Sequence, residues 1–487
     1  MAQYTKSYDS GKPIYPNNGR AVSFAEWKYL TVIKPKDDAD IAGNVMLGFL
    51  GIFTMSQYTS VFQGDVLDSY ILMIQSRFPK LYARVTRPQP VPFKREGFLN
   101  AYIGGTMGSG KSTFATEFLN DLCKEPDFHN ATVVAFDIKR DLVDYLGKST
   151  AREIWYYSTS LYSDRKFSYN PLADIDTSSV LAVNNTVSAF ESILKEKIEP
   201  AQVDIFNPIV RLVSSHNGTF RDVRHILDIN GTDLTPIQTK WMLRGREYKH
   251  NIEVRDFFQR YPKNVHQSSK QSLLRKVRGA IMSPTFATLT CRSSTVSTKE
   301  IIDSKKTVLF DMNHGPDPDA HNQFCAFMLT GLCNALLKRK PNSATFTNDP
   351  VVLVLDEAHF YLNYPLAQTM FSQLRSRGGY VVCLSQILKG RFPDNVADEV
   401  NTVTHKFIGR SESKELGFLL GDKSLDSPDR YEFYAKQGVG ELELFKSTGK
   451  YINASRDYVE EMKNKHHYTP IVEEEVDPPL KPFDWDE

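Results

Sequence analysis

Paired cysteines are missing from this sequence. The 487 residues contain five cysteines, an odd number, and no two of them form a C-x-x-C pair. This pattern predicts neither a disulfide framework nor a zinc site. We interpret the five residues as reduced, buried thiols of a cytosolic protein: Cys123, Cys291, Cys325, Cys333 and Cys383.

A long hydrophobic run is missing as well. The first twenty residues are polar, so we expect no signal peptide. Residues 41–64 lack charged side chains, but Asn44, Gln57 and Gln63 dilute their apolar character. Because a membrane span needs about twenty predominantly apolar residues, the segment favours a buried or interfacial helix. A single transmembrane helix is the alternative.

The chain also has almost no net charge, although two of its segments are strongly charged. The formal net charge is +1. Residues 234–280 contain eleven Lys or Arg and three acids, whereas residues 470–487 contain seven acids and one Lys. The basic segment predicts contact with nucleic-acid phosphates, with a solvated helical face as the alternative. The acidic tail is expected to be disordered, or to dock on a partner through Phe483 and Trp485.

Strand and helix patterns alternate from residue 98 onward, in a chain whose 41% hydrophobic and 24% charged residues are typical of soluble proteins. Apolar runs predict strands at 98–103, 132–136, 306–310, 351–355 and 380–384, with helical patterns at 323–338 and 366–376. Such an alternation predicts an α/β fold with a parallel sheet covered by helices on both faces.

Residues 177–304 interrupt this alternation with helical patterns alone, at 179–197, 204–215, 220–227, 236–258 and 268–280. We predict an inserted all-α domain at 177–304, between the parts of the α/β domain at 98–176 and 305–455. A proline-spaced linker ends an N-terminal region, 1–97, and a flexible acidic tail occupies 456–487. Four basic residues of the insertion are predicted to bind the DNA backbone without reading sequence: Lys270, Arg275, Lys276 and Arg278.

The most specific motif is the string GTMGSGKST at 105–113. Its glycines let the backbone curl so that successive N–H groups face phosphate oxygens. Lys111 is predicted to reach the β- and γ-phosphates of ATP, and the Ser112 hydroxyl to bind Mg²⁺. The other predicted phosphate contacts are Gly105, Gly108, Ser109, Gly110 and Thr113.

Two acids follow the apolar run at 351–355. Because parallel strands present their carboxyl ends to bound phosphates, Asp356 is predicted to hold Mg²⁺ through water, and Glu357 to polarise the attacking water. The string Asp-Glu-Ala-His at 356–359 also spells a helicase box, but the other helicase motifs are not apparent. We interpret His359 as a capping or packing residue.

A third group of candidates surrounds the strand at 380–384. Gln386 follows this strand, where its amide is expected to contact the γ-phosphate or its water. Arg375 and Arg377 precede the strand, at a helix end. Each is interpreted either as a helix-terminal charge or salt-bridge partner, or as an arginine finger that enters the site of a neighbouring subunit.

Taken in order, these motifs resemble the FtsK/HerA class of ring-forming DNA translocases, and within it the TraG/TraD-type coupling ATPases of type IV secretion and conjugation. The resemblance covers residues 98–450. It is carried by the strings at 105–113, 136–139 and 169–172, by Asp356-Glu357, by Arg375 eleven residues ahead of Gln386, and by a late strand at 438–444.

The resemblance implies a RecA-like motor that uses ATP and Mg²⁺ and forms a hexameric ring around DNA. It favours Arg375 as the finger acting in trans and Gln386 as the γ-phosphate sensor. It further implies a coupling ATPase that recruits DNA or nucleoprotein, with relaxosome or secretion-channel partners, in the cytoplasm or at the cytoplasmic face of the inner membrane. Proteins of this type carry clear N-terminal membrane helices, which residues 41–64 do not match.

Two other functions stay open on the sequence. One is a soluble translocase for phage genome packaging, chromosome handling or antiviral defence. The other is an ATPase that powers protein export, with its basic helices meeting an acidic protein partner. Stimulation of ATP hydrolysis by DNA separates the DNA motors from the export ATPase.

Overall fold

The computed structural model describes a large part of the chain from residue 98 to residue 447. The described residues are 98, 100–150, 152–158, 167–193, 198–228, 246–264, 267–312, 318–438 and 440–447. The predictions for residues 1–97, including the segment 41–64, and for the tail at 456–487 lie outside them. Within the described residues, no helix combines the length and apolar character that a membrane span requires.

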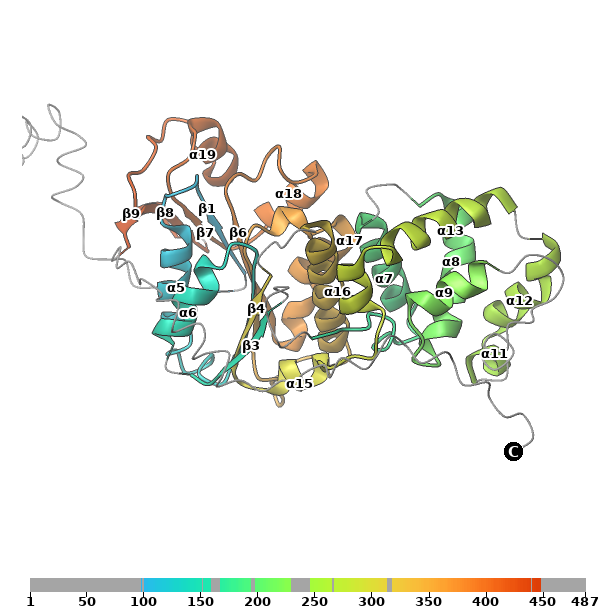
Figure 1. The fold of residues 1–487 in the computed structure, drawn as a ribbon. Helices are drawn as coiled ribbons and strands as arrows, with labels where there is room; N and C mark the ends of the chain where they lie inside the picture. The colour runs from blue at the N-terminus through green and yellow to red at the C-terminus, as the bar shows by residue number, and fades with distance from the viewer. Residues whose placement is uncertain are drawn as a thin grey trace, which may run out of the picture. The chain divides into compact units, whose positions relative to one another are not determined.

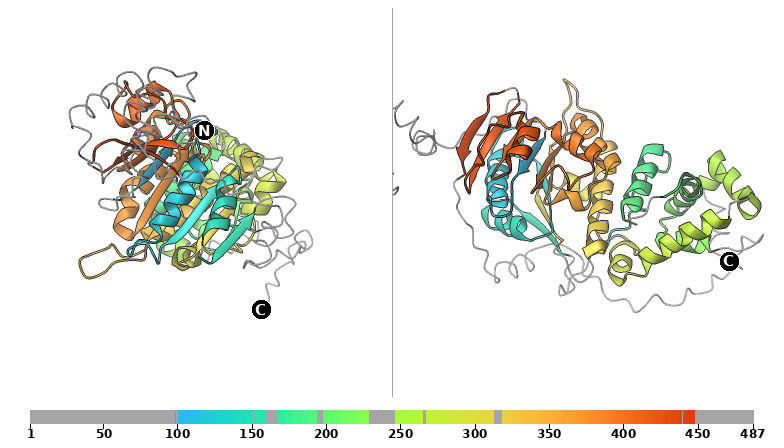
Figure 2. Two further views of the ribbon diagram at one scale, coloured as in Figure 1. Left: turned by 90° about the vertical axis from the view of Figure 1, so that its left-hand side faces the viewer. Right: turned by 90° about the horizontal axis from the view of Figure 1, so that it is seen from above.

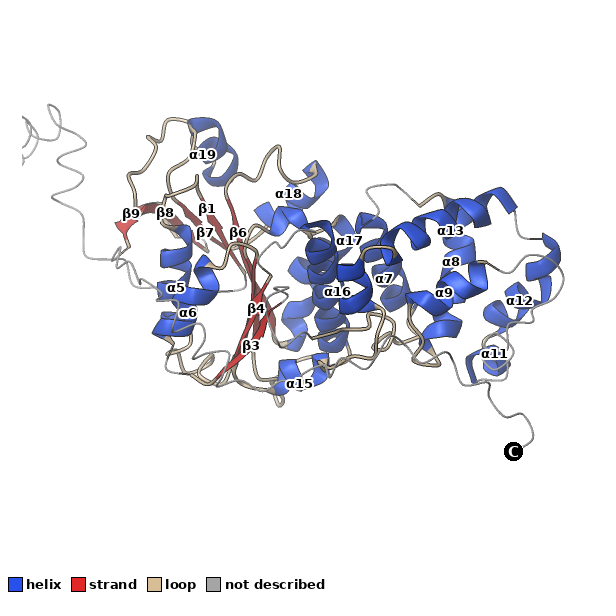
Figure 3. Cartoon of the chain, in the orientation of Figure 1, coloured by secondary structure: helices blue, strands red, loops and turns tan. Residues whose placement is uncertain are grey.

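Nine strands form one sheet with helices packed against it (Figures 1 and 3). They are β1 (Ala101–Gly104), β2 (Thr132–Asp137), β3 (Ile154–Ser158), β4 (Thr307–Asp311), β5 (Val351–Leu355), β6 (Gly379–Ser385), β7 (His405–Ile408), β8 (Glu432–Gln437) and β9 (Glu443–Lys446). Their order is β3-β4-β2-β5-β6-β1-β7-β8-β9. The first seven in this order are parallel, whereas β8 and β9 form an antiparallel edge. The predicted α/β class is confirmed.

The central strands are predictable because they are continuous apolar runs. β5 occupies its predicted range, and β2, β4 and β6 begin and end within one residue of theirs. β3, β7 and β8 mix polar and aromatic residues, and the sequence does not predict them. The late strand expected at 438–444 is wrong in its bounds, because Gly438 adopts a left-handed turn with φ 62° and β9 begins at Glu443.

Helices cover both faces of the sheet (Figure 1). α5 (Lys111–Leu122) and α6 (Asp141–Ser149) pack on one face, and α16 (Pro318–Leu337) and α17 (Tyr364–Gln368) pack on the other. The strands alternate accordingly. Val352 and Val354 of β5 join the core under α5 and α6, whereas Leu353 and Leu355 join the core under α16. Burial on both faces explains the unbroken apolar run of this strand.

The single helix expected at 366–376 is wrong, since the structure divides it into three short pieces. α17 begins after Asn363, whose side chain accepts a hydrogen bond from Leu366 N (3.0 Å). A π-helical turn, η5 (Thr369–Gln373), and a 3₁₀ turn, η6 (Leu374–Arg377), follow. Gly378, with φ 78°, ends the series immediately before β6.

Between β3 and β4 the described residues of 177–304 form helices and no strand (Figure 2). The helices are α7 (Val180–Ile193), α8 (Pro200–Ser214), α9 (Phe220–Leu227), α11 (Arg246–His250), α12 (Ile252–Asn264), α13 (Gln267–Ile281), α14 (Pro284–Thr290) and α15 (Thr298–Asp303). The helix expected at 236–258 is interrupted at Asn251, whose side chain accepts from Val254 N and so begins α12. Residues 236–245 lie outside the described part.

A cluster of phenylalanines joins these helices to α16. The rings of Phe190 (α7) and Phe220 (α9) stack at 4.8 Å. Phe220 lies 5.4 Å from Phe327 of α16, and Phe286 of α14 lies 6.3 Å from the same ring. Because all four side chains are fully buried, the inserted helices share one hydrophobic core with the sheet.

Asn170, from the Asn-Pro-Leu string of the family resemblance, lies shortly before the insertion and has a structural role. It is 1% exposed. Its side-chain amide donates to Gly218 O (2.9 Å), and its Oδ1 accepts from Leu172 N (3.1 Å). The string therefore forms a buried turn that ties residues 167–172 to the loop between α8 and α9.

Candidate functional site

The phosphate loop lies at the carboxyl end of β1, a parallel strand between β6 and β7. Gly110 is the last residue before α5 and has φ 98°, a left-handed conformation that favours glycine. Thr106 N donates to Arg410 O (2.7 Å), which anchors the loop to the end of β7. Ser109 Oγ is buried and has no hydrogen-bond partner among the described residues. A phosphate oxygen would satisfy this hydroxyl, so the loop fits the group that its sequence predicts.

Lys111 is the first residue of α5 and is 9% exposed. Its ammonium group donates to Gly105 O (2.7 Å) and to Thr106 O (3.2 Å), both on the loop. Burial lowers the pKa of Lys111, while the carboxylates of Glu357 and Asp356 act to raise it. The lysine therefore lies over the loop, within electrostatic reach of the acids of β5.

Asp356 follows β5 directly and is 3% exposed. Asp137 ends β2, the neighbouring strand, and is fully buried. Burial, with repulsion from Asp137 and then Glu357, raises the pKa of Asp356 well above its usual range. Burial also raises the pKa of Asp137, to about 6. Two buried carboxyls at adjoining strand ends form an arrangement that a divalent cation would stabilise, so these residues fit Mg²⁺.

Glu357 is held in a left-handed conformation, with φ 47° and ψ 45°, that is unusual for a residue with a side chain. Its Oε1 accepts hydrogen bonds from Lys139 Nζ and from Gln386 Nε2, the second at 2.7 Å. Its Oε2 is buried and has no hydrogen-bond partner among the described residues. Burial acts to raise the pKa of Glu357, but the hydrogen bonds from Lys139 and Gln386 outweigh it and the pKa is lowered. The result is an ionised carboxylate with one uncommitted oxygen, as a general base requires.

His359 lies next to Glu357, with Nδ1 3.5 Å from Glu357 Oε2. Burial lowers the pKa of His359 to about 4, although the Glu357 carboxylate opposes the shift. The imidazole is therefore neutral near pH 7, and the two residues do not form an ion pair. Its ring packs on Phe360 and Phe392, at 4.1 and 5.9 Å, as expected of a packing residue.

Gln386 lies beside Glu357, as its place after β6 predicts. It also accepts a hydrogen bond from the exposed Arg391 guanidinium at 3.4 Å, and Arg391 contacts His359 Nε2 at 3.2 Å. This chain of contacts connects the acid at the strand end to a residue at the surface. The sequence analysis assigned no role to Arg391, because no motif contains it.

Lys139 is the second residue of the site that the sequence analysis missed. It lies in the string at 136–139, which carries the family resemblance, but the string alone gives no role. Its side chain is 42% exposed and forms an ion pair with Glu357, which is 1% exposed. Since the pair joins the end of β2 to the end of β5, only strands brought together by the sheet could reveal it.

The two candidate finger residues lie at the opposite end of β6. They precede this strand, whereas Gln386 follows it, so about seven residues of strand, on the order of 20 Å, separate the two ends. The Arg375 side chain is exposed and makes no hydrogen bond or ion pair with the part of the chain described here. Arg377 is held within its own chain, donating from Nε to Arg339 O (3.2 Å). Both arginines therefore lie at the ends of the strands opposite to the phosphate loop of their own chain.

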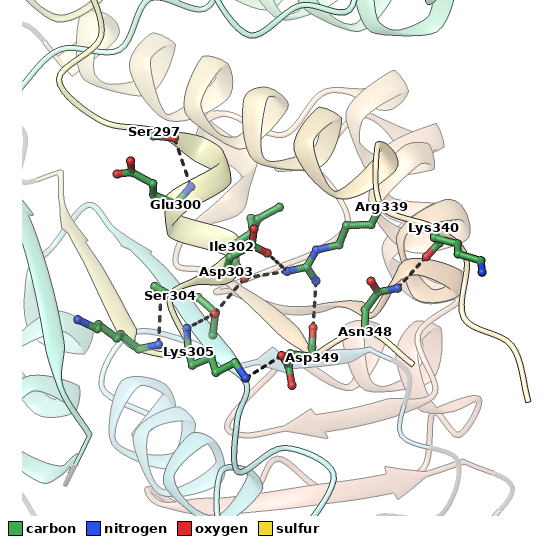
Figure 4. A network of polar contacts seen from close by, with 12 residues as sticks. Ser297, Glu300, Ile302, Asp303, Ser304, Lys305, Arg339, Lys340, Asn348 and Asp349 are labelled. Atoms are coloured by element: carbon green, nitrogen blue, oxygen red, sulfur yellow. Dashed lines mark hydrogen bonds and ion pairs between the residues drawn. The ribbon is translucent and has the colours of Figure 1, made fainter. Parts of the chain in front are cut away.

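A polar network surrounds Arg339, whose carbonyl accepts the hydrogen bond from Arg377 (Figure 4). Arg339 donates to Asp349 O (3.0 Å) and Ile302 O (2.8 Å), and it pairs with Asp303 (2.8 Å). Lys305 pairs with Asp349 at 3.0 Å. These contacts join the end of α15, the residues that follow α16 and the loop before β5.

The predicted DNA contacts on α13 do not behave alike. Lys270 is 2% exposed, and this prediction is wrong because a buried side chain cannot contact a phosphate backbone. Arg278 is exposed but pairs with Asp228 (2.7 Å), and Lys276 contacts Gln202 (3.3 Å). Arg275 is exposed and is the remaining candidate for a free cation on this helix.

The cysteines follow the prediction in part. All five are free thiols, and four are buried, where burial raises their pKa values; Cys123 is partly exposed and accepts a hydrogen bond from Arg152 (3.1 Å).

No protein-family description and no curated protein match this sequence. Solved structures do share its fold. The plasmid coupling protein TrwB with ADP and Mg²⁺ matches with a TM-score of 0.52 and 14% identity, over 77% of this chain and 93% of TrwB. The unbound bacterial conjugative coupling protein TrwBΔN70 matches with a TM-score of 0.51 and 11% identity, over 74% of this chain and 87% of that one. VirB4 of Thermoanaerobacter pseudethanolicus matches with a TM-score of 0.50 and 15% identity, over 75% of this chain and 98% of VirB4.

These matches confirm at the level of the fold the resemblance that the motifs predict. The sheet and its helices have the RecA-like architecture of TrwB and VirB4.

Proposed function

We propose that this protein is a Mg²⁺-dependent ATPase that acts as the coupling motor of a type IV secretion or conjugation system. The observation that carries the proposal is the pairing of a complete phosphate loop, with Lys111, and an ionised, partly uncommitted Glu357 at the same edge of the sheet. The fold supports it, because TrwB has been solved with the analogues ADPNP and GDPNP and with ADP and Mg²⁺.

The residues of the site have distinct tasks in this proposal. Backbone N–H groups of the loop at 105–113 and the Lys111 ammonium bind the phosphates. Ser112 and Asp356 would hold Mg²⁺, which neutralises charge on the phosphate oxygens. Glu357 accepts a proton from the attacking water through its free oxygen, and Gln386 orients that water or the terminal phosphate.

Lys139 maintains Glu357 in its ionised state. Its ammonium group and the Gln386 amide both donate to Oε1, so the carboxylate keeps its charge although it is buried. The same contacts hold the carboxylate in one orientation. Less conformational entropy is therefore lost when the carboxylate binds the attacking water.

Assembly into a ring, with a hexamer as the expected form, would complete this site. Arg375 lies at the far edge of the sheet from its own phosphate loop, so we assign it to the nucleotide of a neighbouring subunit. An arginine supplied in this way stabilises charge on the transferred phosphoryl group.

The proposed substrate is DNA or nucleoprotein, bound through the backbone by the helical insertion at 177–304 and moved through the ring. In this division of the chain, residues 98–176 and 305–455 form the motor. The acidic tail at 456–487 is proposed to contact relaxosome or channel components at the cytoplasmic face of the inner membrane.

A second function is favoured by the surface of α13. Lys270 is buried and Arg278 is paired with Asp228, so fewer cations are available to a polyanion than the sequence predicts. An ATPase that powers secretion without handling DNA would have the same active site and would not need a basic surface.

One experiment separates the two functions. The ATPase rate is measured without DNA, with single strands and with duplex, for the wild type and for Lys111→Ala. A coupling motor gives stimulation by DNA that declines as salt rises, because phosphate contacts release counterions. An ATPase rate that is the same with and without DNA at every salt concentration contradicts the DNA motor. An ATPase rate that Lys111→Ala leaves unchanged contradicts the assignment of the ATP site itself.

A further inference from the structure

The antiparallel edge of the sheet brings a second set of residues to the phosphate loop. β8 pairs with β7 in antiparallel register, with Tyr434 opposite Ile408. The beginning of β8 therefore lies where β7 ends, at the carboxyl edge of the parallel strands. The residue immediately before β8 is Tyr431, and it contacts the loop directly.

Tyr431 is tied to the loop through its backbone and its ring. Its N–H donates to Ser109 O (2.9 Å), and its carbonyl accepts from Ser447 N (2.8 Å) at the end of β9. The half-buried ring covers Gly110, where an added Cβ would overlap ring carbons. Ser447 Oγ in turn donates to Glu117 of α5 (2.9 Å). The end of β9 is therefore bonded both to Tyr431 and to the helix that follows the loop.

Arg430 adds a flat cation to this aromatic ring. Its side chain is exposed, and its guanidinium carbon lies 4.8 Å from the centroid of the Tyr431 ring. Aromatic rings and guanidinium planes are the surfaces on which nucleic-acid bases stack, with little dependence on the identity of the base.

The order of the strands gives the direction in which a nucleotide lies. β5, with Asp356 and Glu357, is on one side of β1, beyond β6, while β7 and β8 are on the other side. The terminal phosphate has to face the acids, since Glu357 supplies the base. The nucleoside end therefore leaves the loop on the side of β7 and β8, where Tyr431 covers Gly110.

We propose that Tyr431 and Arg430 form the nucleoside subsite of this protein, in which the base of the bound triphosphate stacks on the aromatic and guanidinium pair. This inference rests on the proposed ATPase function and names the residues that hold the other end of its substrate.

The test compares ATP with inorganic tripolyphosphate, each with Mg²⁺, by calorimetric titration of the full chain. Tyr431→Ala is expected to weaken ATP binding about tenfold or more, as loss of a base-stacking ring does elsewhere. Tripolyphosphate has no base, so its binding is expected to change by less than about twofold. Tyr431→Phe keeps the ring and is expected to bind both ligands like the wild type, whereas Arg430→Ala is expected to weaken ATP alone.

The outcomes separate the subsite from the ATPase function. Equal weakening of both ligands by Tyr431→Ala would mean that the ring only supports the loop, and it would overturn the subsite. Unchanged ATP binding in Tyr431→Ala would overturn it too. If the wild-type protein bound neither ligand, the ATPase proposal would instead be contradicted. Tripolyphosphate binding also serves as the folding control, because a variant that retains it is folded.

Discussion

Glu357 shares one carboxylate oxygen between Lys139 and Gln386 and leaves the other uncommitted. The proposed role of Glu357 as general base rests on this difference between its two oxygens. The cation keeps the acid ionised, and the second oxygen is the one available to accept a proton.

Lys139→Ala is expected to lower kcat about tenfold, a part of the roughly 10²–10⁴-fold that a general base contributes. The pKa of Glu357 is lowered by the Lys139 contact, so removing the lysine raises it. The carboxylate then becomes protonated at a higher pH, so the acidic limb of the pH profile of kcat moves to higher pH. A pH–rate profile between acid and neutral conditions measures this shift.

Two matched variants control this experiment. Lys139→Arg keeps a cation next to Glu357 and is expected to restore much of the rate and the position of the acidic limb. Lys299→Ala removes an exposed lysine of α15 and is expected to change neither. If Lys139→Ala lowered kcat without moving the limb, Lys139 would not act through the charge of Glu357.

At the scale of the elements, α16 is the helix that joins the sheet to the inserted helices. Its residues pack against β-strand side chains and against the phenylalanines of α7, α9 and α14. The close packing of α16 on Tyr169 depends on Gly331, because a Cβ at this position would overlap the Tyr169 hydroxyl.

Gly331→Ala is therefore expected to reduce the free energy of unfolding by about 1–3 kcal/mol, the usual cost of overpacking a core. Gly279→Ala is the matched control at an exposed position of α13, where an added Cβ meets nothing within 4 Å. It is expected to stabilise by up to about 1 kcal/mol, since alanine has the higher helix propensity. Urea denaturation of both variants measures the difference, and an equal response would contradict the tight packing of α16 on Tyr169.

At the scale of the whole molecule, the proposed arginine finger lies away from the phosphate loop of its own chain. The phosphate loop and the acids lie at the carboxyl ends of the parallel strands. Arg375 lies on η6, at the opposite ends of the strands, where β6 begins. In a ring, the carboxyl ends of the strands in one subunit could face the opposite strand ends of its neighbour. This arrangement would complete every site.

Arg375→Ala is expected to lower ATPase activity about 10³-fold or more, the usual effect of losing an arginine finger. A mixture of Arg375→Ala and Lys111→Ala subunits is expected to regain activity, because the first supplies an intact loop and the second an intact finger. Activity of the mixture no higher than the sum of its parts would exclude this arrangement. Arg377→Ala, which loses a contact to Arg339 in its own chain, should show no such rescue.

The proposed DNA binding by the insertion is expected to depend on Arg275 more than on its neighbours. Arg275→Ala is expected to weaken binding to any sequence and to reduce the salt slope by about one. Lys270→Ala is expected to lower stability instead, since this lysine is buried. Fluorescence anisotropy across a salt series distinguishes these results, and an unchanged slope in Arg275→Ala would remove this residue from the interface.

Local sequence was enough to predict the phosphate loop, the acids after β5 and the central strands. Each is encoded by consecutive residues: glycines that allow the loop to curl, and apolar runs that are buried on both faces of a parallel sheet. Asp356 and Glu357 could be placed for the same reason, because an acid after a buried strand lies at the edge that faces phosphates.

Folding in three dimensions decided what consecutive residues cannot encode. Lys139 meets Glu357 across 218 positions of the chain because β2 and β5 are neighbours in the sheet. Tyr431 reaches Gly110 because β8 reverses direction, and Lys270 is buried because α13 packs its lysine inward. Helical periodicity showed that α13 is a helix with basic residues, but which of them face solvent depended on the helices packed around it.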